Sequence, residues 1–203
     1  MSHDQTFRDV LIAVVLLVLP VGVYHRITSQ ATRERLDRRQ EGLFILATLR
    51  PMGAVFWLGL IAWMVDPAWM AWSSVSLPVR LRWTGVALIL PAGGLLVWTF
   101  LCLGRNLTDT VVTREKHTLI LNGPYRWIRH PLYASAALLT LAISLIVANW
   151  FLFVTGVLVF CLLAIRTRSE EANLVARFGD GYRTYMERTG RFLPRIGAYR
   201  RDA

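Results

Sequence analysis

Residues 131–165, PLYASAALLTLAISLIVANWFLFVTGVLVFCLLAI, decide the fold. They form one long apolar run in which only Asn149 and Trp150 mark a break. A helix needs about 20 apolar residues to cross the roughly 30 Å hydrocarbon core of a bilayer, where every backbone amide must be paired within its own segment. The run is short for two full spans. It therefore predicts a tight helical hairpin, Pro131–Ala148 followed by Trp150–Ile165.

Three further apolar stretches of membrane-spanning length precede this hairpin. They run from Asp9 to Ile27, from Leu43 to Val65 and from Leu81 to Leu103. Hydrophobic residues make up 55% of the chain and charged residues 18%, with a mean hydropathy of +0.44, which is too apolar for an ordinary soluble domain. The sequence therefore predicts an all-α integral membrane protein with five transmembrane helices. We divide its single domain into a three-span region, residues 1–103, and a region of hairpin and polar cap, residues 104–203.

The formal net charge of +10 is concentrated in three segments. Lys and Arg are frequent after the first span (26–39), the third (105–129) and the fifth (166–201), whereas residues 66–79 and the turn at Asn149 have none. Cytoplasmic loops carry the excess of Lys and Arg, so the N-terminus is predicted outside and the C-terminus in the cytoplasm. The Arg cluster after the first span also favours its retention as a span over cleavage as a signal peptide. Because these cations lie between apolar runs, they indicate anionic lipid headgroups rather than nucleic acid.

The polar segment before the hairpin has an ordered composition. It contains LILNGPYRWIRHPLY at residues 119–133, where Gly123-Pro124 signals a turn and Pro131 suits the first position of the fourth helix. Arg129 and His130 are thereby expected at the membrane–water boundary on the cytoplasmic side.

A second polar segment, residues 166–196, follows the fifth span on the same side. It begins with Arg166 and continues to the adjacent carboxylates Glu170 and Glu171. Arg166 and Glu170 are spaced i,i+4 and share a helix face. Adjacent helical residues point about 100° apart, so only one of the two glutamates is expected to face a shared pocket. The hairpin is expected to bring this segment close to His130.

Residues 178–186 predict a short amphipathic helix after a Gly break, with Tyr182, Tyr185 and Met186 on one face. Such a helix is suited to cover a site as a lid. A purely structural interpretation stays open at this point, because Arg, His and Glu at helix ends are common as snorkelling anchors and surface ion pairs. Cys102 and Cys161 lack metal-ligand spacing, and no metal site is predicted.

Together these residues resemble a known family. The run Gly123-Pro124-Tyr125-Arg126-x-x-Arg129-His130-Pro131-x-Tyr133, then Arg166-x-x-x-Glu170-Glu171 and Phe178-Gly179-x-x-Tyr182-x-x-Tyr185, is similar to the isoprenylcysteine carboxyl methyltransferase and phospholipid methyltransferase family. The resemblance covers roughly residues 104–196, and Ser135 stands where the family usually has Gly. It implies membrane-embedded transfer of a methyl group from S-adenosylmethionine, with this cofactor enclosed at the cytoplasmic ends of the last helices.

The resemblance also implies roles for individual residues. A cation, Arg166 or Arg129, is expected to orient an anionic acceptor, and Glu170 completes the expected catalytic set. A lipid amine as acceptor requires a base instead, for which His130 or a glutamate is the candidate. The cofactor-binding residues are expected to be His117, Leu119, Gly123, Tyr125, Arg129, His130, Pro131, Tyr133, Glu170, Glu171, Tyr182 and Tyr185.

Arg50 lies within the second span beside Pro51. Ionisable residues inside a membrane are functional candidates, so Arg50 is a candidate for substrate binding together with Arg166, with snorkelling to the cytoplasmic face as the alternative. The acceptor stays open among a prenylated cysteine, a phospholipid amine, a small thiol and a hydrophobic acid. The expected partners are this lipophilic substrate and membrane lipids, in the inner membrane if the source is bacterial.

Two other functions stay open from the sequence. A membrane reductase that uses NADPH has a related hairpin architecture, although such reductases have longer chains. A small transporter or assembly subunit without catalysis is the second alternative. Its sequence signal is limited to Gly93-Gly94 after Pro91, which a packing role explains equally well.

Overall fold

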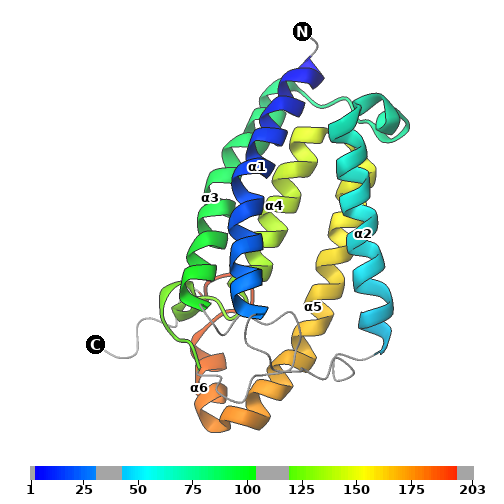
Figure 1. Cartoon of the computed structure of the whole chain (residues 1–203). Coiled ribbons are helices and arrows are strands. Elements are labelled where there is room, and N and C mark those ends of the chain that lie inside the picture. Colours follow the sequence, from blue (N-terminus) through cyan, green and yellow to red (C-terminus); the bar gives the residue numbers. More distant parts are fainter. Residues whose placement is uncertain (1–2, 31–42, 104–118, 196–203) are drawn as a thin grey trace.

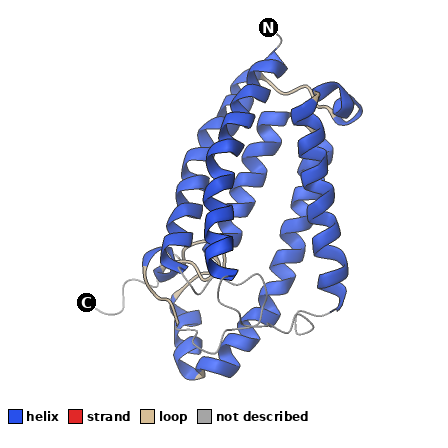
Figure 2. Cartoon of the chain, viewed as in Figure 1, coloured by secondary structure: helices blue, strands red, loops and turns tan. Residues whose placement is uncertain are grey.

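The computed structural model describes residues 3–30, 43–103 and 119–195. This part of the chain is helical, with no strand and only two isolated β-bridges (Figures 1 and 2). Five long helices form a bundle, and a sixth short helix lies at the end away from the N-terminus. In chain order the elements are α1 His3–Gln30, α2 Leu43–Val65, the 3₁₀ helix η2 Pro67–Ser73, α3 Val79–Leu103, the 3₁₀ helix η4 Gly123–Arg126, α4 Pro131–Val147, α5 Trp150–Phe178 and α6 Asp180–Arg188.

Four of the helices, α1, α2, α3 and α5, are long and apolar enough to cross a membrane. The fifth, α4, is apolar but has 17 residues, which is short for a full span. The all-helical prediction is confirmed for the described residues, with four to five apolar helices. The helix α2 has the predicted bounds, whereas α1 and α3 begin before the predicted Asp9 and Leu81. The helix α5 continues well past Ile165, because residues 166–178 are good helix formers although they are polar.

The predicted hairpin is present between α4 and α5. Its turn is made by Ala148, in the left-handed conformation with φ 53°, and by Asn149, whose side chain caps α5 by accepting a hydrogen bond from the Leu152 amide at 3.1 Å. The Asn149 amide nitrogen also donates to the Met70 carbonyl at 3.2 Å and to Ser73 Oγ at 2.7 Å. These bonds join the hairpin to η2 and fix the end of the bundle that lies nearer to the N-terminus.

Two glycines let neighbouring helices approach α4 closely. A Cβ at Gly85 of α3 would lie 2.7 Å from the Ala142 carbonyl oxygen, and one at Gly156 of α5 would collide with the Thr140 side chain. Close approach at small residues is the usual way in which apolar helices pack in lipid. The helix α4 is therefore held between α3 and α5, which positions its first residue, Pro131, against the polar end of α5.

Candidate active site

The imidazole of His130 lies between the two glutamates of α5. His130 precedes α4 as its N-cap residue and is 5% exposed. Its Nε2 is 3.2 Å from Glu171 Oε1, and its Nδ1 is 4.0 Å from Glu170 Oε1. The hydroxyl of Tyr133 donates to Glu170 Oε2 at 2.9 Å, and its ring stacks on His130 with centroids 5.5 Å apart. Both glutamates thus face the cluster, whereas only one of them was expected to. The reason is that the two nitrogens of the His130 ring lie toward different glutamates.

Glu171 is the most densely bonded side chain of the cluster. It is 4% exposed, and its carboxylate accepts hydrogen bonds from the Arg129 Nε at 2.9 Å and from the Arg191 Nη2 at 2.5 Å. The Nη1 of Arg129 continues to the carbonyls of Met186, at 2.9 Å, and Thr189. A buried carboxylate with two guanidinium partners is stable only when it keeps them, so this network fixes the end of α6 against α4 and α5.

The segment after α6 pairs with the segment before α4. The Gly190 amide donates to the Trp127 carbonyl at 3.1 Å, the Arg129 amide donates to the Gly190 carbonyl at 2.8 Å, and the His130 amide donates to the Arg191 carbonyl at 3.0 Å. Arg191 was not among the residues predicted for the site, since the sequence shows it as one of many cations in a basic tail. Gly190, between Thr189 and Arg191, is the weak sequence signal that a chain reversal ends α6 there.

The short helix α6 lies next to the cluster. It begins after Gly179, whose φ is 58°, and buries Tyr182 and Tyr185 with ring centroids 5.6 Å apart. The Tyr185 hydroxyl donates to the Tyr125 carbonyl at 2.6 Å. Burial raises the pKa of Tyr185 to about 12, and burial likewise raises the pKa values of Tyr182 and Tyr125 above the ordinary range for phenols. All three phenols are therefore neutral hydrogen-bond donors at physiological pH.

The turn at η4 joins the cluster to α3. Gly123 has φ 58°, and a Cβ there would collide with Cys102 Sγ near the end of α3. Only Gly adopts this conformation without strain, so the predicted turn requires it. Leu119, which opens this segment, is half-buried. His117 lies outside the described residues.

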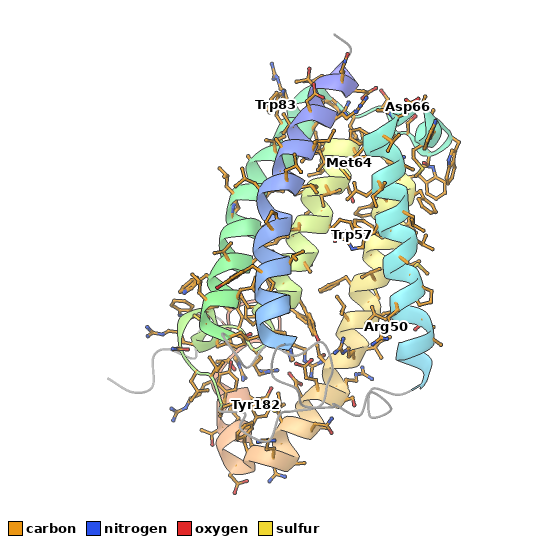
Figure 3. The ribbon with its side chains drawn as sticks, viewed as in Figure 1. Arg50, Trp57, Met64, Asp66, Trp83 and Tyr182 are labelled. Atoms are coloured by element: carbon orange, nitrogen blue, oxygen red, sulfur yellow. The ribbon has the colours of Figure 1, made fainter. Side chains whose placement is uncertain are left out.

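Most of the residues predicted for the site are brought together. Arg166 is half-buried on α5, one helical turn before Glu170. Arg50 is exposed on α2, in the half of that helix nearer to Tyr182 (Figure 3), and makes no hydrogen bond or ion pair with the described residues of the cluster. Within the described residues no three His, Cys, Asp or Glu side chains are grouped so that they hold a metal ion. The cluster unites Tyr125, Arg129, His130, Pro131, Tyr133, Glu170, Glu171, Tyr182 and Tyr185 with the unpredicted Arg191.

Comparison with known proteins shows that the part of the chain around this cluster is similar to a known family. Residues 85–176, from α3 to the polar end of α5, match the model of the isoprenylcysteine carboxyl methyltransferase (ICMT) family. The matched range contains both His130 and the Glu170–Glu171 pair, and relatives and a solved structure of the same family match as well. This part of the chain is similar to the isoprenylcysteine carboxyl methyltransferase family. The resemblance seen in the sequence is thereby confirmed.

The relatives match different shares of the chain. The protein-S-isoprenylcysteine O-methyltransferase of Schizosaccharomyces pombe is 29% identical over 48% of the chain and 48% of its own length. The methanethiol S-methyltransferase of Pseudomonas deceptionensis is 25% identical over 92% of the chain and 73% of its own length. The chain thus spans about half the length of the S. pombe relative.

The fold is also similar to that of a solved ICMT structure. The eukaryotic intramembrane Ras methyltransferase ICMT superposes with a TM-score of 0.54 and 22% identity, over 72% of the chain and 52% of that structure. The similarity concerns the fold. The apolar helices and the similarity to the ICMT family support an integral membrane protein.

Proposed function

We propose that the protein is a membrane-embedded methyltransferase that transfers a methyl group from S-adenosylmethionine to a lipophilic or thiol acceptor. The observation that carries this proposal is the placement of His130 against Glu170 and Glu171, at one end of the bundle and under the tyrosines of α6. The relatives' names include a carboxyl methyltransferase and a thiol methyltransferase, so the transfer of a methyl group is what they share.

The chemistry of the cluster fits this cofactor. The side chain of Glu170 is 27% exposed, and Tyr133 occupies Oε2 whereas Oε1 lies 4.0 Å from His130. Glu170 therefore has acceptor capacity left for an ammonium or hydroxyl group, whereas Glu171 is surrounded by Arg129, His130 and Arg191. Carboxylates and the faces of aromatic rings also attract a positively charged sulfur atom electrostatically. S-adenosylmethionine would supply an activated methyl group on such a sulfur.

The residues of the chain then have three tasks. Glu170 and Tyr133 bind the cofactor's polar groups, whereas Arg129 and Arg191 hold Glu171 and so keep His130 in place. Methyl transfer is an in-line displacement, for which alignment and exclusion of water provide most of the acceleration. The buried tyrosines of α6 and the cluster of ion pairs are suited to exclude water.

Arg166 is the residue that we assign to the acceptor. It lies one turn before Glu170 on the same face of α5, so an acceptor beside it is also beside the cofactor site. Arg129 is engaged with Glu171 and two backbone carbonyls, which leaves it a positioning task. An acceptor that is already an anion, a carboxylate or a thiolate, needs a cation to orient it and no base. We therefore favour an anionic acceptor, with Arg50 as a further contact for a substrate that enters from the lipid.

We also propose the membrane topology. Five spans place the N-terminus outside and the His130 cluster on the cytoplasmic side, because the sequence segments rich in Lys and Arg connect the helices at that end of the bundle. The 17 residues of α4 are about 26 Å long at 1.5 Å per residue, and local thinning of the bilayer accommodates the difference from about 30 Å.

The deciding experiment identifies the acceptor directly. Membranes that contain the protein are incubated with methyl-labelled S-adenosylmethionine, and the labelled product is extracted and identified by mass spectrometry. A prenylated cysteine analogue, methanethiol and a phosphatidylethanolamine are then tested as added acceptors. Label in a lipophilic carboxyl ester or a thioether is expected. Thermal stabilisation of the purified protein by NADPH and not by S-adenosylmethionine would instead support a reductase.

A further inference from the structure

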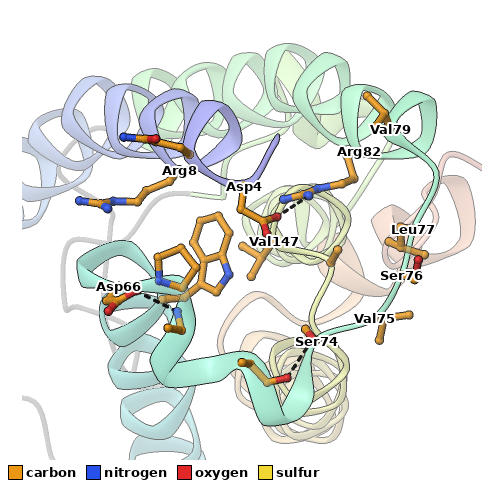
Figure 4. A pocket seen from close by; sticks show the side chains of 16 residues that line it. Asp4, Arg8, Asp66, Ser74, Val75, Ser76, Leu77, Val79, Arg82 and Val147 are labelled. Carbon is orange, nitrogen blue, oxygen red and sulfur yellow. Dashed lines mark hydrogen bonds and ion pairs between the residues drawn. The ribbon is translucent and has the colours of Figure 1, made fainter. Parts of the chain in front are cut away.

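The end of the bundle opposite the His130 cluster contains a large cavity. It has a volume of about 780 Å³ and lies where α1, η2, α3 and the end of α4 meet (Figure 4). This volume is in the range of pockets that bind drug-sized molecules and is much larger than an inorganic ion needs. Its lining includes Asp4 and Arg8 of α1, Trp63 and Asp66, Arg82 of α3, and Val147 of α4.

The guanidinium of Arg82 is built into the wall of this cavity. Arg82 is 6% exposed, its Nε donates to the Ile146 carbonyl at 2.9 Å, and its Nη1 pairs with Asp4 Oδ1 at 2.6 Å. The ring of Phe7 lies against it, 4.1 Å from the guanidinium carbon. Its Nη2 is buried and has no hydrogen-bond partner among the described residues, and the same is true of the Nε of Arg8. Arg82 is thus held in the wall by Asp4 and Ile146, and the cation of the lining that is left for a ligand is Arg8.

One cation and one anion of the cavity lining have no ion-pair partner among the described residues. Asp4 is neutralised by Arg82, whereas neither Arg8 nor Asp66 has an ion-pair partner in the described part of the chain. Asp66 Oδ1 accepts a hydrogen bond from the Ala68 amide at 2.9 Å, which leaves Oδ2 available. Arg8 and Asp66 lie on different walls of the cavity, one on α1 and one before η2 (Figure 4). A ligand with separate negative and positive groups satisfies both.

The surroundings of the cavity indicate a lipid. Four tryptophans at this end of the bundle are exposed, Trp69 and Trp72 of η2, Trp83 of α3 and Trp150 at the start of α5. Exposed tryptophans of a membrane protein gather at the level of the lipid headgroups. The lining also includes the buried apolar side chains of Trp63 and Val147, which suit the glycerol and upper acyl chains of a lipid.

We propose that this cavity binds the headgroup of a zwitterionic phospholipid, with the phosphate at Arg8 and the ammonium at Asp66. The site is independent of the methyl-transfer reaction, because it lies at the other end of the helices. A bound lipid there joins α1 to η2 and α3 and anchors that end of the bundle in its leaflet.

The test measures lipid binding to the full chain in detergent by native mass spectrometry. Phosphatidylethanolamine is compared with phosphatidylglycerol, which lacks the ammonium, and with inorganic phosphate. We expect phosphatidylethanolamine to bind at least about tenfold more tightly than phosphatidylglycerol, since a charge-assisted hydrogen bond is at stake. Equal binding of the two lipids overturns the proposed headgroup, and occupancy by inorganic phosphate to the exclusion of lipid overturns the proposed lipid.

Two variants with matched controls locate the site. Arg8→Gln is expected to weaken phosphatidylethanolamine binding about tenfold or more, and Asp66→Asn is expected to abolish the preference over phosphatidylglycerol. The controls Arg80→Gln and Asp9→Asn change exposed charges at the same end of the bundle outside the lining, and both should bind as the wild type does. Because Asp66 is exposed, its variant keeps the test decisive if Arg8→Gln does not fold. An effect of the controls equal to that of the cavity variants contradicts the proposal.

Discussion

Arg191, beyond the last helix, donates from Nη2 to Oε2 of Glu171 at 2.5 Å and from Nε to Oε1 at 3.3 Å. The same residue accepts the His130 amide on its backbone carbonyl at 3.0 Å. One residue of the C-terminal segment therefore holds both the carboxylate on α5 and the backbone of His130 before α4. The integrity of the candidate active site thus depends on a part of the chain that lies outside the matched family range, residues 85–176.

Replacing Arg191 tests this dependence. In Arg191→Ala the carboxylate of Glu171 keeps Arg129 and His130 but loses one charge-assisted pair, so we expect a loss of about 1–3 kcal/mol in the free energy of unfolding. The loss should be seen as a Tm lower by roughly 5 °C in detergent. Arg191→Lys should recover part of it. The control is Arg183→Ala, which removes an exposed pair with Asp180 on α6 and should change Tm by much less.

Replacing Glu170 should affect cofactor binding, whereas replacing Glu171 should affect the free energy of unfolding. Glu170→Gln is expected to weaken S-adenosylmethionine binding about tenfold or more with little change in Tm, because Glu170 is partly exposed and its hydrogen bond from Tyr133 can be kept by the amide oxygen. Glu171→Gln leaves the buried Arg129 without its carboxylate and should reduce the free energy of unfolding by about 3–5 kcal/mol. Calorimetric titration and thermal unfolding measure the two effects. Unchanged cofactor affinity in a folded Glu170→Gln protein would sink the assignment of Glu170.

Arg166 should act on the acceptor and not on the cofactor. Arg166→Gln is expected to raise the KM for an anionic acceptor about tenfold or more, with cofactor affinity unchanged, because the guanidinium orients the acceptor. Arg168→Gln removes an exposed cation from the same polar end of α5 and serves as the control. If both variants change KM equally, the effect is a general electrostatic one and Arg166 has no specific contact.

The sequence predicted the helices better than the contacts between them. Hydropathy located α2 to the residue, and the two-residue break at Asn149 was sufficient to predict the hairpin and the meeting of His130 with Glu171. Arg191 was missed because its role depends on backbone pairing of Gly190 with Trp127 and Arg129, and such pairing across the chain leaves no local pattern. Likewise, residues 66–79 had no Lys or Arg and gave no sign that η2 lines a cavity.

Alkaline titration should reveal the buried tyrosines of α6 and η4. Ordinary phenols ionise near pH 10, whereas burial raises the pKa of Tyr185 to about 12 and raises those of Tyr125 and Tyr182 as well. Because the folded-state pKa exceeds the unfolded one, these phenols contribute stability that is complete below about pH 10 and is lost as the pH rises toward 12. Ultraviolet difference spectra should show a late tyrosinate step that coincides with unfolding. Tyr185→Phe should reduce its amplitude, and a single step near pH 10 in the folded protein contradicts their burial.

The close packing of α3 on α4 predicts opposite effects for two glycines of one helix. In Gly85→Ala the new methyl group lies 2.7 Å from the Ala142 carbonyl oxygen and 2.8 Å from the Leu145 Cβ, so the two helices must move apart. Overpacking of this kind typically reduces the free energy of unfolding by about 1–3 kcal/mol. In Gly93→Ala nothing lies within 4 Å of the new atom, and the better helix propensity of Ala should leave the protein as stable or more stable, by up to about 1 kcal/mol. Thermal unfolding in the same detergent compares the two variants, and equal shifts in Tm would show that α3 and α4 are not in contact at Gly85.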